Sequence, residues 1–151
     1  MLLTTADGEP FATGMTLYSY RPAINDISNR IMLHVEIEGV LIQGIVDTGS
    51  PYVVCPPHLS DIIGFDPADA IESIPYRVRG NLMWGSLYRV DVLFLADQGD
   101  DIRVDATVFV PDAEWQDTWG EFPGFIGLTG CLERLRFAVD PENNRFYFGA
   151  L

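Results

Sequence analysis

The chain has 151 residues, 48% of them hydrophobic, with 22 acidic and 9 basic side chains and a formal net charge of −13. This length and composition predict one folded domain with a substantial core and exclude intrinsic disorder. The acidic balance argues against nucleic acids and anionic membrane surfaces as partners, because both require basic patches on the protein. No apolar run approaches the ~20 residues of a membrane span, and residues 1–7 lack the features of a secretory signal, so we expect a cytoplasmic protein.

The N-terminal segment shows little hydrophobic periodicity. Residues 1–25 contain glycines and prolines at irregular intervals, a composition typical of turns and loops. We therefore expect an irregular N-terminal extension over residues 1–25, with a short strand at residues 15–20. The remaining residues, 26–151, would form the domain itself.

A β-hairpin is predicted immediately before the most informative motif of the chain. Apolar residues alternate at positions 33, 35 and 37, as on a strand with one buried face. Glu38-Gly39 provides a two-residue turn, and residues 40–46 return as a more fully apolar strand. The hairpin therefore places Asp47 in a loop at the end of a buried strand.

The rest of the chain predicts short strands separated by turns, with little helix. Strands are expected at residues 74–79, 87–95, 102–110, 125–128, 136–140 and 145–148. Short helical segments are expected at residues 59–63 and 130–135. The acidic segment 111–122 is expected to be a loop pinned by Trp115 and Trp119. Many short strands with minimal helix favour an all-β closed barrel or sandwich.

The tetrapeptide Asp47-Thr48-Gly49-Ser50 lies between apolar residues 41–46 and the apolar segment that follows Pro51. A carboxylate at such a turn neither packs in the core nor behaves as an ordinary surface charge. Gly49 supplies the backbone freedom that a sharp turn needs, and the hydroxyls of Thr48 and Ser50 can bond to neighbouring backbone.

This motif with its flanks resembles the active-site turn of the aspartic proteases. Residues 30–150 resemble the retropepsin-type branch of that family, whose members are single-domain and homodimeric. The wider resemblance rests on element order: a hairpin, D-T-G-S, a glycine-bracketed hairpin, an alternating strand, Phe-Ile-Gly, a short helix and a terminal hairpin. It implies an all-β, retropepsin-like closed barrel or sandwich with one short C-terminal helix. Because the motif occurs once, it also implies that two subunits each contribute one Asp47.

The resemblance implies an aspartic endopeptidase that acts on a protein or peptide substrate without a metal or organic cofactor. As in aspartic proteases generally, the two Asp47 carboxylates would share one proton and activate a water molecule. Thr48 and Gly49 would support the loop, and Ser50 could bond to the outer oxygen of the carboxylate. Residues of a flap and of a strand beside the loop would contact substrate: Gly80, Asn81, Leu82, Met83, Trp84, Gly85, Phe125, Ile126 and Gly127. The strand at residues 146–148 would join a sheet shared by both subunits.

The chain also departs from the pattern of the viral family members. Those members have an Asp soon after the motif and an Arg after the later glycine. Here these places hold Pro51 or Tyr52 and Leu128. The resemblance therefore does not imply an intersubunit ion pair of that kind.

Several alternatives stay open from the sequence alone. Asp47 could be a structural turn residue, or the chain could be a non-catalytic module of the same fold that binds peptides or dimerises. A third hypothesis is a latent protease that becomes active when residues 1–25 are trimmed. Cys55 and Cys131 are expected to be reduced and buried, with a disulfide the less favoured alternative. Neither lies near a histidine at a metal-ligand spacing, so no metal site is predicted.

Overall fold

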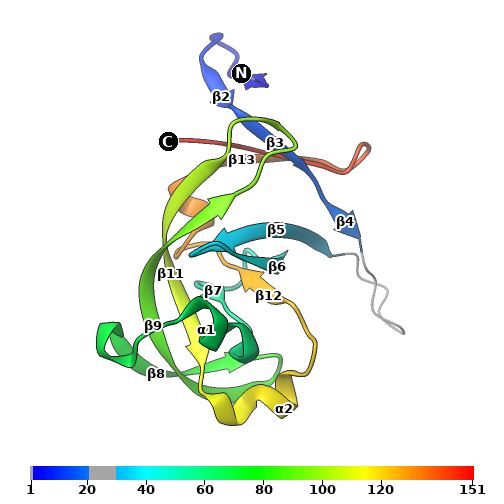
Figure 1. Ribbon diagram of the computed structural model, residues 1–151. Coiled ribbons are helices and arrows are strands. Elements are labelled where there is room, and N and C mark those ends of the chain that lie inside the picture. The colour runs from blue at the N-terminus through cyan, green and yellow to red at the C-terminus, as the bar shows by residue number, and fades with distance from the viewer. Residues whose placement is uncertain (1, 21–29) are drawn as a thin grey trace.

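The computed structural model describes residues 2–20 and 30–151, which form mainly β-strands (Figure 1). The strands are β1 (Leu3–Thr4), β2 (Pro10–Ala12), β3 (Gly14–Leu17), β4 (Ser19–Tyr20), β5 (Ile31–Ile37), β6 (Val40–Val46), β7 (Val53–Val54), β8 (Glu72–Val78), β9 (Asn81–Phe94), β10 (Gln98–Gly99), β11 (Ile102–Pro111), β12 (Gly124–Ile126), β13 (Arg136–Asp140) and β14 (Arg145–Gly149). The helices are α1 (Pro57–Ile63) and α2 (Gln116–Trp119), and the 3₁₀ turns are η1 (Pro67–Asp69), η2 (Ala113–Trp115) and η3 (Leu132–Arg134). The predicted all-β class is confirmed.

The largest sheet has eight strands in the order β4-β5-β6-β12-β7-β11-β9-β8, and β5 also pairs with β9. This second pairing turns the sheet back on itself around the main core. The two longest strands, β9 and β11, lie side by side along much of the molecule (Figure 1) and are in register from Ile102 opposite Phe94 to Pro111 opposite Gly85. Buried aliphatic and aromatic side chains from both strands face that core.

The β5–β6 hairpin forms as its sequence pattern predicts. Val35 pairs with Ile42, and the alternating apolar residues of β5 face the core. Glu38 and Gly39 form the turn with φ values of 49° and 77°, the left-handed pair that suits a two-residue hairpin. Strand β6 then ends at Val46, so the hairpin carries Asp47 to the edge of the core.

The described part of the N-terminal segment differs from the irregular extension expected there. Strand β3 lies between β10 and β14, and β4 pairs with β5, so residues 14–20 belong to the two larger sheets of the domain. Strands β1 and β2 form a separate two-stranded sheet. The short strand expected at residues 15–20 is present as β3 and β4. Strands β1 and β2 are only two and three residues long, too short for hydrophobic periodicity to reveal them. The expected boundary between residues 25 and 26 lies outside the described residues, and the division into extension and domain stays a prediction.

A smaller sheet of four strands has the order β10-β3-β14-β13. The expected terminal hairpin is present as β13 and β14, which Figure 1 shows beside the N-terminal strands. Strand β14 is flanked on both sides by strands of its own chain, so it is not the open edge that a shared intersubunit sheet would require. In the part of the chain that the structure describes, no strand pairs with the outer edge of β13.

The helical segments differ in detail from those expected. Helix α1 starts at Pro57, whose ring suits the first helical turn, and ends at Gly64 with φ 84°. The expected C-terminal helix is the shorter 3₁₀ turn η3. The segment expected to be a loop contains η2 and α2, and Trp119 anchors it because only 2% of this side chain is exposed. None of the helices in the described ranges has the length and apolar character needed to cross a bilayer.

Candidate active site

Backbone hydrogen bonds fix the turn that carries Asp47. The Asp47 amide donates to the carbonyl of Ile126 at 3.0 Å, which ties the end of β6 to the parallel strand β12. The Ser50 amide donates to the Asp47 carbonyl at 3.1 Å and closes the turn. The Gly49 amide donates to Asp47 Oδ1 at 2.9 Å and orients the half-exposed carboxylate.

Close backbone contacts with residues 127 and 128 also fix the turn that carries Asp47. A Cβ atom on Gly127 would lie 2.2 Å from the Tyr52 carbonyl oxygen and 2.6 Å from that of Ser50. The Leu128 amide donates to the Ser50 carbonyl at 2.7 Å. The segments 44–50 and 122–130, called the floor below, therefore form one close-packed unit beneath the carboxylate.

The hairpin of β8 and β9 covers the floor, and its end, residues 74–85, is called the flap below. Its turn is Arg79-Gly80, with φ values of 51° and 81°, and Val78 pairs with Asn81. Of the residues expected to form a flap, 80–85, residues 81–85 lie in strand β9, and their role in closing over substrate stays a prediction. Gly85 serves a different purpose from Gly80: a Cβ there would lie 2.4 Å from the Val110 carbonyl oxygen of β11.

A cavity of about 270 Å³ lies between floor and flap. It is lined by Asp47, Gly49, Ser50, Val54, Tyr76, Arg77, Val78, Arg79 and Phe125. The structure thus brings together four residues predicted for the site: Asp47, Gly49, Ser50 and Phe125.

The other predicted site residues lie outside the cavity lining. Thr48 is exposed, Ile126 is in the core, and Gly127 lies in the floor. Within the predicted flap residues 80–85, the side chains alternate, so Met83 is buried while Leu82 and Trp84 are about half exposed. The flap residues that line the cavity instead come from β8 and the turn, on the other side of the hairpin.

Tyr76 of β8 is a site residue that the sequence analysis missed. Its hydroxyl hydrogen-bonds the Ser50 hydroxyl at 2.8 Å, and Ser50 Oγ donates to the Tyr52 carbonyl at 3.1 Å. The expected bond from Ser50 to the Asp47 carboxylate is therefore replaced by bonds to two tyrosines. Burial raises the pKa of Tyr76, the Ser50 bond opposes this, and the negative charge of Asp47 adds to it. Alternating residues 74, 76 and 78 are the only sequence signal that Tyr76 faces inward.

The tip of the flap contacts the floor through an arginine and an aromatic ring. The Arg79 guanidinium lies over the Phe122 ring, 3.6 Å from its centroid. Phe122 in turn packs against Phe125 at a centroid distance of 5.7 Å, and the Trp119 indole donates to the Phe122 carbonyl at 2.6 Å. Burial and the nearby charge of Arg30 lower the pKa of Arg79.

Both cysteines are free and buried close to the floor. Cys55 follows β7, and Cys131 follows Gly130. Burial raises the pKa of each thiol to about 12. The predicted burial of both thiols is confirmed, and neither sulfur is available as a nucleophile near neutral pH.

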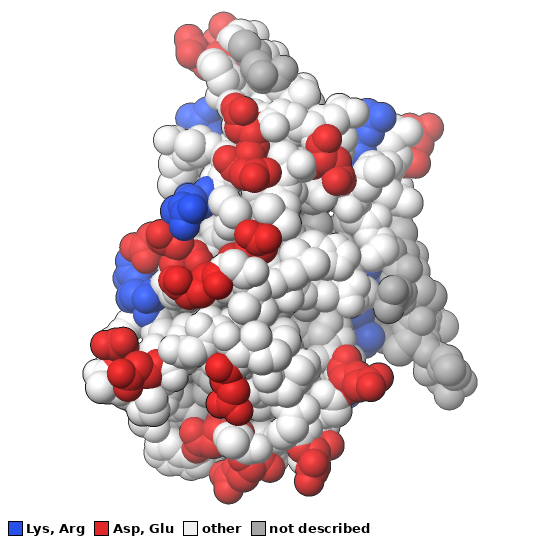
Figure 2. Space-filling view, viewed as in Figure 1, with Lys and Arg blue, Asp and Glu red and all other residues white. Residues whose placement is uncertain are grey.

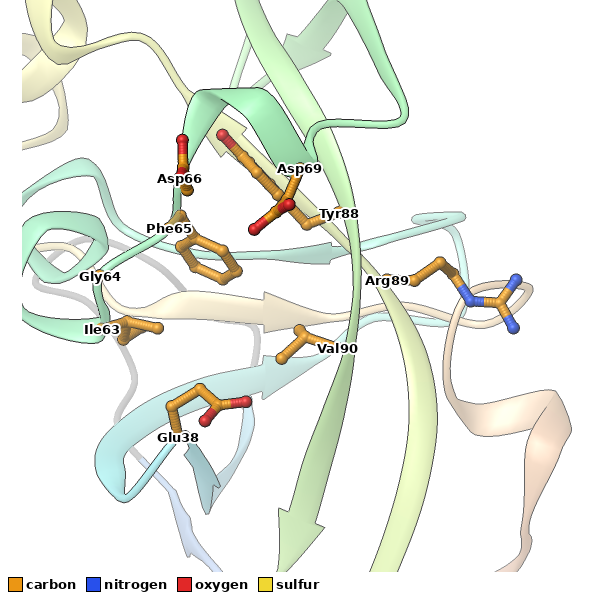
Figure 3. A pocket seen from close by; sticks show the side chains of 9 residues that line it. All are labelled: Glu38, Ile63, Gly64, Phe65, Asp66, Asp69, Tyr88, Arg89 and Val90. Atoms are coloured by element: carbon orange, nitrogen blue, oxygen red, sulfur yellow. The ribbon is translucent and has the colours of Figure 1, made fainter.

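A second cavity of about 280 Å³ lies away from Asp47 (Figure 3). Its lining includes three acidic residues, Glu38, Asp66 and Asp69, but the guanidinium of Arg89 points away in Figure 3 and pairs with Asp105 at 2.5 Å. Asp66 accepts from the Ala68 amide and so caps η1. Within residues 2–20 and 30–151, no group of three or more His, Cys, Asp or Glu is arranged to hold a metal ion.

No protein-family model matches this chain, and no curated protein matches its sequence. Its fold is similar to the crystal structure of a retropepsin-like aspartic protease from Rickettsia conorii, with 15% identity, a TM-score of 0.58, and coverage of 91% of this chain and 94% of that chain. It is also similar to the retroviral protease-like domain of Ddi1 from Leishmania major, with 16% identity, a TM-score of 0.49, and coverage of 81% and 94%. The first similarity shows that the chain has the retropepsin-like, all-β fold.

Proposed function

We propose that this protein is an aspartic endopeptidase that works as a homodimer. One observation carries the proposal. In a retropepsin-like fold, the half-exposed Asp47 carboxylate is oriented by a backbone amide and opens on a cavity between floor and flap. A carboxylate held in this way is suited to act on a water molecule at a fixed position.

The mechanism follows from bringing two such carboxylates together. Two Asp47 side chains in contact across a two-fold axis share one proton, as in aspartic proteases generally. The ionised carboxylate removes a proton from water, which attacks the peptide carbonyl, while the protonated one donates to the developing oxyanion. Proton transfer to the leaving nitrogen then breaks the peptide bond. The peptide would lie extended between floor and flap, with backbone hydrogen bonds to both.

The unpaired outer edge of β13 supports a homodimer, because the same strand of a second copy could pair with it. An antiparallel pairing of two β13 strands centred on Ala138 would place Arg136 of each copy opposite Asp140 of the other. Such opposite charges stabilise cross-strand pairs. The contact would join the two small sheets across the two-fold axis.

The decisive test of catalysis is cleavage of a peptide library by the wild type and Asp47→Asn, read by mass spectrometry between about pH 3 and 7. We expect the variant to lose about 10³-fold or more of the activity, since it lacks the general base. A statine-type inhibitor should block the wild type. Equal cleavage by both proteins would refute the mechanism. No cleavage by either would favour a non-catalytic module that binds peptides or dimerises.

The dimer contact is tested by exchanging its charges. Arg136→Glu should weaken self-association by about 10-fold or more, because each Glu would face Asp140. The double variant Arg136→Glu, Asp140→Arg should restore it. Sedimentation measures both, and unfolding in urea checks that each variant is folded. A monomeric wild type, or no rescue in the double variant, would exclude this contact.

We do not favour the alternative of a latent protease that becomes active when residues 1–25 are trimmed. Removal of this segment would take away β3, which is paired with β14 along Leu17 to Gly14. It would also expose the edge of β14 and a part of the small sheet. We therefore expect a trimmed protein to be less stable, rather than more active.

A further inference from the structure

Two arginines line the cavity that contains Asp47, although the chain is strongly acidic. Acidic side chains are spread over the face of the molecule in Figure 2, and all nine basic residues of the chain are arginines. Two other arginines pair with carboxylates: Arg89 with Asp105 at 2.5 Å, and Arg103 with Asp91 at 3.7 Å. Arg134 and Arg136 donate to backbone carbonyls instead.

Arg77 and Arg79 differ from the two arginines that pair with carboxylates. They line the Asp47 cavity, and neither forms a salt bridge with any carboxylate in the described residues. Arg77 Nη1 donates only to the Gly80 carbonyl, at 3.3 Å. What sets Arg77 and Arg79 apart is their place on the cavity of the candidate active site, where guanidinium groups that are not neutralised by a salt bridge can bind a carboxylate from outside.

The contact with Phe122 holds Arg79 in a position suited to bind a carboxylate from outside. Stacking at 3.6 Å covers one face of the guanidinium but leaves the N–H groups at its edge able to donate. A planar guanidinium held in place binds a carboxylate with two parallel hydrogen bonds. Because Phe122 packs against Phe125 of the cavity lining, the donor is ordered before a ligand arrives.

The backbone at Arg79 supports the same conclusion. Its φ of 51° lies in the left-handed region, which favours Asn, Asp or Gly in a two-residue hairpin turn. An arginine at this position strains the backbone without improving the turn. Strained residues of this kind cluster at active sites and ligand-binding sites, where the side chain has a function.

We propose that Arg77 and Arg79 form a subsite that selects a substrate peptide with an Asp or Glu side chain near the cleaved bond. This inference rests on the proposed peptidase function. The carboxylate would bind to the guanidinium groups at the flap, on the same cavity as Asp47. The two arginines are specificity-determining residues and take no part in the proton transfers.

The test uses pairs of peptides that differ only by Glu or Gln at one position, scanned along the sequence, all with amidated C-termini. At one position, we expect the wild type to show a kcat/KM about 10-fold or more higher for Glu, as a charge-assisted hydrogen bond provides. Arg77→Gln, Arg79→Gln should reduce this ratio to about 1, because kcat/KM should fall much more for the Glu peptide than for the Gln peptide. The matched control Arg103→Gln removes one charge away from the cavity and should keep the wild-type ratio.

Three results would overturn the subsite. The first is a Glu-to-Gln ratio of kcat/KM near 1 in the wild type, and the second is a wild-type ratio in the double variant. The third is an equal loss of cleavage for both peptides, which would mean that the arginines only hold the flap closed. A fourth arm compares free and amidated C-termini. A preference that appears only with a free C-terminus would assign the arginines to the terminal carboxylate and overturn selection of a side chain.

Binding separates this inference from the proposed function. Fluorescence anisotropy with Asp47→Asn measures the affinity for labelled Glu and Gln peptides without cleavage. If the wild type cleaves nothing, tighter binding of the Glu peptide that is lost in Arg77→Gln, Arg79→Gln would still support the subsite. Equal binding of the two peptides would overturn it, whatever the outcome for catalysis.

Discussion

The floor and the flap enclose the same carboxylate but are held in place by different kinds of interaction. In the floor, main-chain hydrogen bonds link Asp47 to Ile126 and Leu128 to Ser50, and Gly127 leaves no room for a side chain. Between flap and floor, the contacts are made by side chains, above all the Tyr76 hydroxyl on Ser50 and the Arg79 guanidinium on Phe122.

This difference predicts a rigid floor and a flap that can open to admit substrate. Rearranging the floor would break several backbone bonds of the core at once. Lifting the flap tip would break the Tyr76–Ser50 hydrogen bond and the Arg79–Phe122 contact, each worth about 1 kcal/mol. Lifting the whole flap would also expose Val78 and Met83, which are buried against Phe109 and Trp119. A catalytic carboxylate must stay fixed while substrate enters and leaves, so the two regions meet opposite requirements.

The largest effect is expected in the floor, from Gly127→Ala. The new methyl group would collide with two carbonyl oxygens that belong to the fixed turn, so the free energy of unfolding should fall by about 3 kcal/mol or more. Unfolding in urea measures this loss. As a control, Gly39→Ala places its methyl group in open space at φ 77°, where only the left-handed backbone opposes it, at about 1 kcal/mol. Equal losses for the two variants would show that the floor can adjust.

The floor was also the region that the sequence predicted best. Asp47 follows an apolar strand directly, and Phe125-Ile126-Gly127 is a compact signal, so local pattern was enough to identify both segments. Their pairing came from the resemblance to retropepsins. The assigned roles of Thr48 and Gly49 in supporting the loop stay predictions.

The flap and the small sheet depend on contacts that local pattern does not encode. Gly80 and Gly85 look equivalent in the sequence, yet Gly80 provides a positive φ and Gly85 provides space for β11. The stacking of Arg79 on Phe122 and the pairing of β3 with β14 join segments far apart in the chain. Such contacts appear only when the tertiary structure is known.

A smaller effect is expected from Tyr76→Phe in the flap. Loss of the bond to Ser50 should lower the free energy of unfolding by about 1 kcal/mol at pH 7. Because the folded state raises the pKa of Tyr76, the stabilisation from this hydroxyl is complete below the ordinary tyrosine pKa and declines as the pH rises through the folded value. The difference between wild type and variant should therefore shrink above about pH 10. Urea unfolding at pH 7 and at alkaline pH measures both values.

The control for Tyr76→Phe is Tyr147→Phe in β14. The Tyr147 hydroxyl has no hydrogen-bond partner among the described residues, so its removal should change stability by only a few tenths of a kcal/mol. If Tyr76→Phe costs no more than this control, the flap is not held by the Ser50 bond.

The smallest effect is expected from Phe122→Leu, which keeps apolar volume in the floor and removes the ring beneath Arg79. Loss of about 0.5–1 kcal/mol of cation–π attraction should speed hydrogen exchange at the flap tip, residues 79–81, about 2- to 5-fold, with little change in global unfolding. Phe65→Leu is the matched control, because its ring packs on Tyr88 at the second cavity. Exchange at the tip that is unchanged by Phe122→Leu would contradict the comparison, because the flap would then be held by its backbone, as the floor is. Faster exchange in the Phe122 variant alone would show that contacts with this ring, made by Arg79 at 3.6 Å and by Arg30 at 5.6 Å, limit opening of the flap tip.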